Sequence, residues 1–283
     1  MSAQISESLL RAQEISLKIE GVELLSDIDL DIQPGEVVAL IGPNGSGKTT
    51  LLKTLCGEHM PARGSVLFQD RNLHDWPKKE LARHIAVLPQ KSVLNFPFSS
   101  REVVGLSRTP HESGTEADAK IVDEVLDYLD AGYLADRLYT NLSGGEQQRV
   151  QLARVLAQVW QEAEYPRLLI LDEPSSFFDL SHQQMLVDLV RGLAEKNIAV
   201  LVVLHDINLA MSCADRVAVL SCGRLAAFGE TDKVVTTEML ESVFSVKAKF
   251  LFDPESGRRF LSTTGAVIPS KDMVGLSETA GRA

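Results

Sequence analysis

A glycine-rich loop that contains one lysine follows an apolar run near the amino end of the chain. The run is Val37–Ile41, and the loop continues into the helix-compatible segment Leu51–Cys56. The loop fits the pattern G-x-x-x-x-G-K-[ST], which binds nucleotide phosphates when it lies between a strand and a helix. The candidate phosphate-binding residues are Gly42, Pro43, Asn44, Gly45, Ser46, Gly47, Lys48, Thr49 and Thr50.

The chemistry of this loop follows from its residue types. Glycines let successive backbone N–H groups point at phosphate oxygens, and the helix that follows adds a partial positive charge at its start. Lys48 supplies a cation for the β- and γ-phosphates, the Thr49 hydroxyl suits Mg²⁺, and Thr50 adds a hydrogen bond to phosphate. The alternative is a glycine-rich turn with a surface lysine, and the complete motif in its proper context disfavours it.

An acidic pair ends a second apolar run. Leu168–Leu171 is followed directly by Asp172 and Glu173. An aspartate at this place suits holding Mg²⁺, usually through water, and the glutamate suits acting as general base toward the attacking water. Such a pair is common at strand ends, so it gains its meaning only beside the phosphate loop. The two features together allow a kinase, a GTPase or an ATPase.

A pair of glycines further along the chain narrows the choice between a kinase, a GTPase and an ATPase. Ser143 and Glu146 have the spacing of a capping box, which predicts a helix that begins after Ser143. Gly144 and Gly145 leave the first N–H groups of that helix uncovered, so its start is a second place suited to an anion. A small-molecule kinase has no use for a second anion site. An ordinary helix cap is the alternative, which the glycine pair disfavours.

In their order and approximate spacing, these motifs resemble those of the ATP-binding cassette (ABC) family. The phosphate loop, LSGGEQQR at 142–149, LILDEP at 169–174 and His205-Asp206 carry the resemblance, which covers roughly residues 10–260. It implies an α/β P-loop ABC ATPase cassette with a parallel core sheet, an N-terminal antiparallel β subdomain and a helical subdomain that carries LSGGE. It also implies ATP and Mg²⁺ as cofactors and ATP hydrolysis as the activity.

The resemblance also assigns roles to residues that no motif above explains. By analogy, Gln90 is the loop glutamine that senses Mg²⁺ and the attacking water, and His205 is the histidine that contacts the γ-phosphate. Residues 176–179 occupy the dimer-contact loop. The expected catalytic residues are therefore Glu173, His205 and Gln90, and the expected metal-binding residues are Thr49, Gln90 and Asp172.

Two positions depart from the pattern of the family. Ile19-Glu20-Gly21 stands where such cassettes often carry an aromatic residue that stacks on adenine, so adenine stacking is weakened or comes from another residue. Phe177 and Phe178 stand in the dimer-contact loop where small residues are usual. These rings are expected to pack differently at the interface.

In the ABC family two cassettes enclose two ATP molecules, and each phosphate loop faces the LSGGE motif of the other subunit. One copy of each motif therefore implies a homodimer. Four further stretches, residues 142–160, 166–167, 179–184 and 96–99, resemble the ATPase subunits of haemin importers, and ferric-siderophore and cobalamin importers share part of them. This implies a transmembrane permease dimer, a periplasmic substrate-binding protein reached through the permease, and a place on the cytoplasmic face of the bacterial inner membrane.

The contact with the permease is expected at residues 96–104. A proline separates Phe96 from Phe98 and disfavours helix at Phe96, so these rings can project from a loop. Ser99 and Glu102 then predict a short capped helix. The alternative is that both rings fill the local core.

The elements between the motifs support an α/β fold. Apolar residues alternate with polar ones over 15–19 and 28–32, which predicts half-buried strands, whereas Ile198–Leu204 is a continuous apolar run typical of a parallel sheet. Residues 114–131 and 146–160 have helical spacing, and Trp160 is expected on the buried face. Residues 217–228 predict a hairpin that turns at Ser221-Cys222-Gly223.

These patterns also suggest boundaries. We expect residues 1–10 to form an N-terminal extension, residues 11–263 to form the cassette with its helical subdomain at about 91–163, and residues 264–283 to form a disordered tail. The apolar periodicity stops beyond about Thr263, which is typical of a frayed end.

Composition excludes several classes. The chain has 283 residues with 28 Lys+Arg against 39 Asp+Glu and a net charge of −11, which disfavours nucleic acid as a partner. Its three cysteines match neither a disulfide framework nor a zinc-ligand set, so they are expected to be reduced. The amino end lacks the apolar core of a secretory signal, and the chain has no apolar run long enough to span a bilayer.

A DNA-maintenance ATPase of the coiled-coil cassette type is the other class to exclude. It would need a long heptad insert between Lys48 and Ser143, and no heptads run there.

Overall fold

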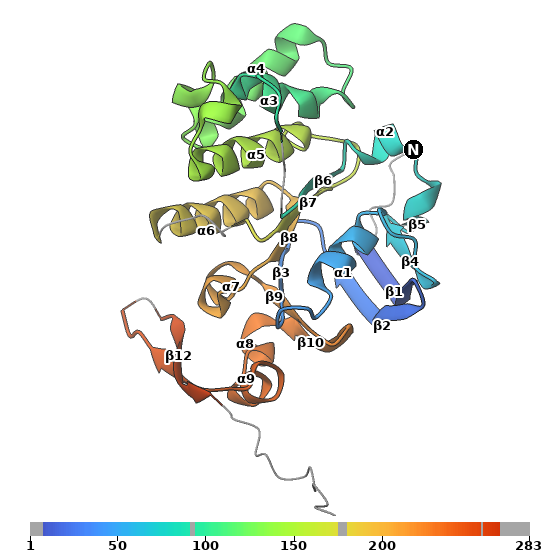
Figure 1. The fold of residues 1–283 in the computed structure, drawn as a ribbon, viewed down its shortest axis with the longest axis vertical. Helices are drawn as coiled ribbons and strands as arrows, with labels where there is room; N and C mark the ends of the chain where they lie inside the picture. Colours follow the sequence, from blue (N-terminus) through green and yellow to red (C-terminus); the bar gives the residue numbers. More distant parts are fainter. Residues whose placement is uncertain (1–7, 91–93, 175–179, 256, 267–283) are drawn as a thin grey trace, which may run out of the picture. The chain divides into compact units, whose positions relative to one another are not determined.

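The computed structural model describes residues 8–90, 94–174, 180–255 and 257–266 (Figure 1). The contacts divide the chain into two units, Met1–Val235 and Thr236–Ala283. The first unit carries every motif singled out above, and each unit is described by itself.

A six-stranded sheet with the order β10-β9-β3-β8-β7-β6 forms the centre of the first unit. Strands β6 to β9 and β3 run parallel, and β10 pairs with β9 in the antiparallel sense. Every residue of β3, β7 and β8 is buried, which explains their continuous apolar runs and confirms the predicted parallel sheet. The strands are β3 (Val37–Ile41), β6 (Ile85–Leu88), β7 (Arg167–Asp172), β8 (Ile198–Val203), β9 (Arg216–Ser221) and β10 (Arg224–Glu230).

A four-stranded antiparallel sheet, with the order β2-β1-β4-β5, packs beside it. Its buried side chains, such as Ile15, Ile28 and Phe68, share one apolar core with Leu40 and Leu201 of the central sheet. The predicted alternation is confirmed at Ile15, Leu17 and residues 28–32, whereas Ile19 at the end of β1 is exposed. The strands are β1 (Leu10–Ile19), β2 (Val22–Ile32), β4 (Arg63–Phe68) and β5 (Arg71–Asn72).

Three helices lie together between β6 and β7 in the chain, at the top of Figure 1. They are α3 (Ser100–Gly105), α4 (Thr115–Tyr128) and α5 (Gly144–Gln158), and the short 3₁₀ helix η2 (Leu106–Arg108) continues α3. Ser99 and Glu102 form the predicted capping box of α3. The other described helices of this unit are α1 (Lys48–Leu55), α2 (Lys78–Leu81), α6 (Leu180–Glu195), α7 (Ile207–Cys213) and α8 (Thr231–Val234).

The prediction that Trp160 lies on the buried face of a helix is wrong. Helix α5 ends at Gln158, and Trp160 follows it as a half-buried residue. Its ring contacts Tyr128 at a centroid distance of 5.2 Å, and the ammonium of Lys196 lies 4.6 Å from its centroid. Side chains of Arg108 and His111 bind the last two carbonyl groups of the helix.

The second unit contains helix α9 (Thr237–Phe244) and an antiparallel hairpin of β11 (Val246–Phe252) and β12 (Arg259–Ala266). The expected tail begins at residue 264, whereas Thr264, Gly265 and Ala266 belong to β12. Cross-strand pairing orders these three residues although their sequence lacks apolar alternation. Residues 267–283 lie outside the described residues.

Among the residues that the structure describes, no helix is both long enough and apolar enough to cross a bilayer.

Candidate nucleotide-binding site

The glycine-rich loop leaves β3 at a point where only a glycine fits. A Cβ atom on Gly42 would lie 2.1 Å from the carbonyl oxygen of Leu220, the penultimate residue of β9. Gly45 and Gly47 adopt φ angles of 77° and 103°, which L side chains rarely adopt. The spacing of these glycines therefore follows from the turn that brings the loop back over the sheet edge to start α1.

Lys48 is the buried cation of this loop. Its side chain is 7% exposed, and its Nζ donates hydrogen bonds to the carbonyl oxygens of Gly42 at 2.9 Å and Pro43 at 3.0 Å. Burial lowers the pKa of Lys48, and the nearby carboxylates of Glu173 and Asp172 oppose that shift. The ammonium thus stays among the loop carbonyls, where an anion with negative oxygens could attract it.

Thr49 and Asp172 join the phosphate loop to strand β7. The Thr49 hydroxyl donates to Asp172 Oδ2 at 3.1 Å, although the two residues lie far apart in sequence. Asp172 is 4% exposed and its Oδ1 is buried without a hydrogen-bond partner. Desolvation raises the pKa of Asp172, and the adjacent negative charge of Glu173 adds to this rise.

These groups fit a magnesium ion. Mg²⁺ prefers hard oxygen donors and is often held by one or two carboxylates together with substrate phosphates. Thr49, Gln90 and Asp172, the three expected metal-binding residues, line a common cavity of about 220 Å³. An unsatisfied carboxylate oxygen beside a hydroxyl in this cavity is the observation that supports the fit.

Glu173 brings the expected catalytic residues together. Its Oε2 accepts a hydrogen bond from Gln90 Nε2 at 2.7 Å, and its Oε1 lies 2.6 Å from His205 Nε2. Its backbone φ angle of 53° is unusual for a residue other than glycine, and such backbone strain tends to persist at functional sites. Two side chains therefore hold a carboxylate at the edge of the sheet, where it could accept a proton from water.

A cavity of about 570 Å³ lies over the phosphate loop. Eight of the expected site residues line it, from the phosphate loop and from the ends of β6 and β7. They are Asn44, Gly45, Gly47, Lys48, Thr49, Thr50, Gln90 and Glu173. Gly42, Pro43 and Ser46 belong to the loop but are not among the lining residues. The cavity is large enough for a nucleotide-sized ligand.

The sequence did not point to one wall of this cavity. Glu23 and Leu24 of β2, with Cys222 and Gly223 of the β9–β10 turn, complete its lining. The structure confirms the predicted hairpin. The sequence did not predict its position against the phosphate loop, which backbone bonds such as Gly223 N to Ser46 O at 2.9 Å hold in place. None of the described lining residues is aromatic, so adenine stacking on a ring has no support here.

The second anion-suited helix start is open and separate from this cavity. Ser143 caps α5, and the Glu146 carboxylate accepts bonds from the Ser143 backbone N–H and hydroxyl, both at 2.8 Å. The backbone bond from Ser143 is the largest cause that lowers the pKa of Glu146. A Cβ atom on Gly144 or Gly145 would meet nothing within 4 Å. Residues 143–146 do not line the cavity over the loop of their own chain.

Asp206, which follows His205, caps helix α7 by accepting hydrogen bonds from the backbone N–H groups of Asn208 and Leu209 at 2.8 and 3.3 Å. The expected dimer-contact loop at 176–179, with Phe177 and Phe178, lies outside the described residues.

The fold and this site together define a P-loop ATPase cassette. The chain belongs to the ABC transporter family, whose model matches residues 25–176.

Curated relatives cover almost the whole chain. The hemin import ATP-binding protein HmuV of Pseudomonas entomophila is 46% identical over 90% of this chain and 100% of its own length. HmuV of Gloeobacter violaceus is 47% identical over 88% of this chain and 92% of its own length.

Among solved structures, a chain of an inward-facing ABC transporter matches with a TM-score of 0.77 and 26% identity, covering 92% of this chain and 98% of its own length. The ATP-binding cassette MJ0796, solved as a dimer in a post-hydrolysis state with ADP and Pi, matches with a TM-score of 0.69 and 27% identity. It covers 78% of this chain and 98% of its own length.

The magnesium fit leads to a prediction for Asp172→Asn. An amide keeps the shape but loses the charge, so we expect the Mg²⁺-dependent gain in ATP affinity to fall by about 10- to 100-fold. Calorimetric titration of ATP with and without Mg²⁺ measures this gain. Asp70→Asn, at an exposed carboxylate that pairs with Arg11 at 3.8 Å, is the control. A full Mg²⁺-dependent gain in Asp172→Asn would contradict the assignment.

Proposed function

We propose that this chain is the ATP-hydrolysing subunit of a bacterial haemin importer. The observation that carries the hydrolytic part is the convergence of Gln90 and His205 on the Glu173 carboxylate beside the phosphate loop. The similarity to HmuV proteins over most of the chain carries the cargo.

In this proposal the loop residues 42–50 and Asp172 bind Mg²⁺-ATP. Backbone N–H groups of the loop and the start of α1 hold the phosphate oxygens, and Lys48 leaves the loop carbonyls to contact the β- and γ-phosphates. Mg²⁺, held through Thr49, Asp172 and Gln90, would neutralise charge on the phosphates.

Glu173 is the proposed general base. A water between Glu173 and the γ-phosphate would give its proton to the carboxylate as it attacks. Gln90 orients Glu173, the metal and that water, and His205 contacts the γ-phosphate. Both side chains already bond to the carboxylate, so a small shift of either would change where Glu173 points.

Glu173→Gln should bind ATP as the parent does and lose turnover by about 10²- to 10⁴-fold, because the amide keeps the shape but cannot accept the proton. Phosphate release measures turnover, and size-exclusion chromatography with Mg²⁺-ATP should show an accumulated dimer. Glu116→Gln on the exposed first turn of α4 is the matched control. Near-parental hydrolysis by Glu173→Gln would rule out the role of general base.

A homodimer is part of the proposal. The open start of α5, with Ser143, Gly144, Gly145 and Glu146, does not line the cavity of its own chain and is free to reach the nucleotide of another copy. The similar ATP-binding cassette MJ0796 was solved as a dimer with ADP and Pi bound. Each ATP would then lie between Lys48 of one subunit and Ser143 of the other.

Mixing two inactive variants tests this arrangement. In a heterodimer of Ser143→Arg and Lys48→Ala subunits both substitutions fall in the same composite site, so the other composite site is intact. Hydrolysis should return on mixing, measured against each variant alone, with two affinity tags to count heterodimers. No recovered activity despite heterodimers would contradict action in trans.

A transmembrane permease dimer is the proposed partner on the cytoplasmic face of the inner membrane, and a periplasmic binding protein would reach this subunit only through it. The proposed contact is the segment around Phe96 and α3. Phe96 is 63% exposed, Phe98 is half-buried, and their ring centroids lie 6.0 Å apart. An exposed ring beside a capped helix could bind an apolar permease helix in a groove.

The cargo is tested with assembled transporters. The chain is co-expressed with each permease of its own genome and reconstituted in vesicles, and Lys48→Ala assemblies are the controls. ATP-dependent uptake of haemin is expected. Uptake of a ferric siderophore or cobalamin instead would contradict the haemin assignment while leaving the ATPase assignment intact.

A further inference from the structure

The carboxyl end of α5 is saturated by side chains that come from other elements. The last carbonyl groups of a helix lack partners within the helix and must find them elsewhere. Here the last two carbonyls of α5, those of residues 157 and 158, contact side-chain nitrogens of Arg108 and His111, and the next three carbonyls, those of residues 159–161, contact the guanidinium of Arg167. The distances from carbonyl oxygen to side-chain nitrogen are 2.8 Å to Arg108 and 2.8 Å to His111. Those from the three following carbonyls to Arg167 are 3.0, 3.1 and 2.8 Å.

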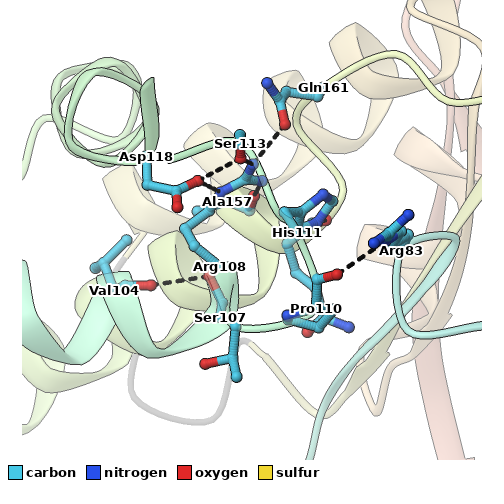
Figure 2. A network of polar contacts seen from close by, with 12 residues as sticks. Arg83, Val104, Ser107, Arg108, Pro110, His111, Ser113, Asp118, Ala157 and Gln161 are labelled. Atoms are coloured by element: carbon cyan, nitrogen blue, oxygen red, sulfur yellow. Dashed lines mark hydrogen bonds and ion pairs between the residues drawn. The ribbon is translucent and has the colours of Figure 1, made fainter. Parts of the chain in front are cut away.

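Arg108 holds this end from the helical side. It is 2% exposed, and its guanidinium bonds to Asp118 Oδ1 at 2.9 Å, Ser113 Oγ at 3.0 Å and the side-chain oxygen of Gln161, besides the carbonyl of Ala157 (Figure 2). Figure 2 shows these partners converging on Arg108 from α4, α5 and the segment after η2. The planar fork of arginine suits several acceptors at once, which a lysine cannot match.

Arg167 holds the same end from the core. It is 6% exposed, begins strand β7, and also donates to the carbonyl oxygen of Lys196, the residue after α6, at 3.1 Å. Burial lowers the pKa of Arg167, but an arginine remains charged in proteins. Its positive charge lies at the negative end of the α5 dipole, which is favourable.

This junction ties two parts of the proposed machinery. Strand β7 starts at Arg167 and ends at Asp172, beside Glu173, and α5 starts at Ser143. Near the amino end of α5, Gln148 donates to the carbonyl of Pro174 at 3.3 Å. Fifteen residues make α5 about 22 Å long, so a tilt of about 5° at the junction would move Ser143 by roughly 2 Å.

We propose that Arg167, with Arg108, is a positioning residue for ATP hydrolysis: it fixes the direction of α5 relative to β7 and thereby aims Ser143 at the nucleotide of the partner subunit. The inference rests on the proposed action of Ser143 in trans. A misplacement of about 1 Å can lower a rate by about 10²-fold, so the junction affects catalysis without touching ATP.

The test compares binding with turnover in the full chain. Arg167→Met removes the guanidinium but keeps the length of the side chain. We expect ATP affinity within about twofold of the parent, because the phosphate loop is untouched, and kcat lower by about tenfold or more. Arg216→Met is the control, since this arginine bonds to Asp31 at 3.0 Å and Glu36 at 3.5 Å rather than to α5. It should lower the melting temperature and leave kcat of the folded protein unchanged.

A double variant separates positioning from general damage. If Arg167 acts through Ser143, Ser143→Ala with Arg167→Met should be no slower than Ser143→Ala alone. Multiplied losses, or an Arg167→Met variant with parental kcat, would overturn the inference. Parental kcat in Ser143→Ala would instead overturn the proposed action in trans. If Arg167→Met does not fold, Arg167→Lys and Arg108→Lys carry the same comparison, because each keeps the charge and loses the fork.

Discussion

The common edge of the parallel strands is the constraint on which the site depends. The carboxyl ends of parallel strands meet at one edge of a sheet, and β6, β7 and β8 are neighbours in the sheet order. Gln90 follows β6, Glu173 follows β7 and His205 follows β8, so two residues distant in sequence meet at the carboxylate of a third. Strand β3, on the other side of β8, delivers the phosphate loop to the same edge. The fold thus sets the geometry, and the loops need only short extensions to complete it.

Burial at this edge removes water from two groups of opposite charge, Lys48 and Asp172, and so destabilises their charged forms. It lowers the pKa of Lys48 and raises that of Asp172, so each charged form is disfavoured by the loss of water. Lys48 bonds to loop carbonyls and Asp172 leaves one oxygen unsatisfied. A magnesium ion beside Asp172 and phosphate oxygens beside Lys48 would satisfy both groups at once. A metal or an anion alone would relieve only part of this destabilisation.

The sequence predicted those parts of the molecule in which local chemistry determines structure. The glycines of the loop, the capping boxes at Ser99 and Ser143 and the buried strands are fixed by neighbours in sequence, and the structure has them as predicted. It could not predict contacts made between distant segments. The bonds from Arg108 to the carbonyl of Ala157 and from Arg167 to that of Lys196 join segments that no local pattern brings together. The wall formed by Leu24 and Cys222 depends on where two hairpins dock.

The two ends of α5 are treated differently, and this difference has a physical consequence. At the carboxyl end, the last two carbonyls of α5 and the three that follow it have side-chain partners, and two buried arginines face the negative end of the dipole. At the amino end, Glu146 occupies the cap while Gly144 and Gly145 stay open. A helix that is held by side chains along its length and has uncovered N–H groups at its start can present those donors to an anion outside its own chain with little loss of conformational entropy. The side-chain contacts at the carboxyl end would thus fix the direction in which the uncovered N–H groups at the amino end point.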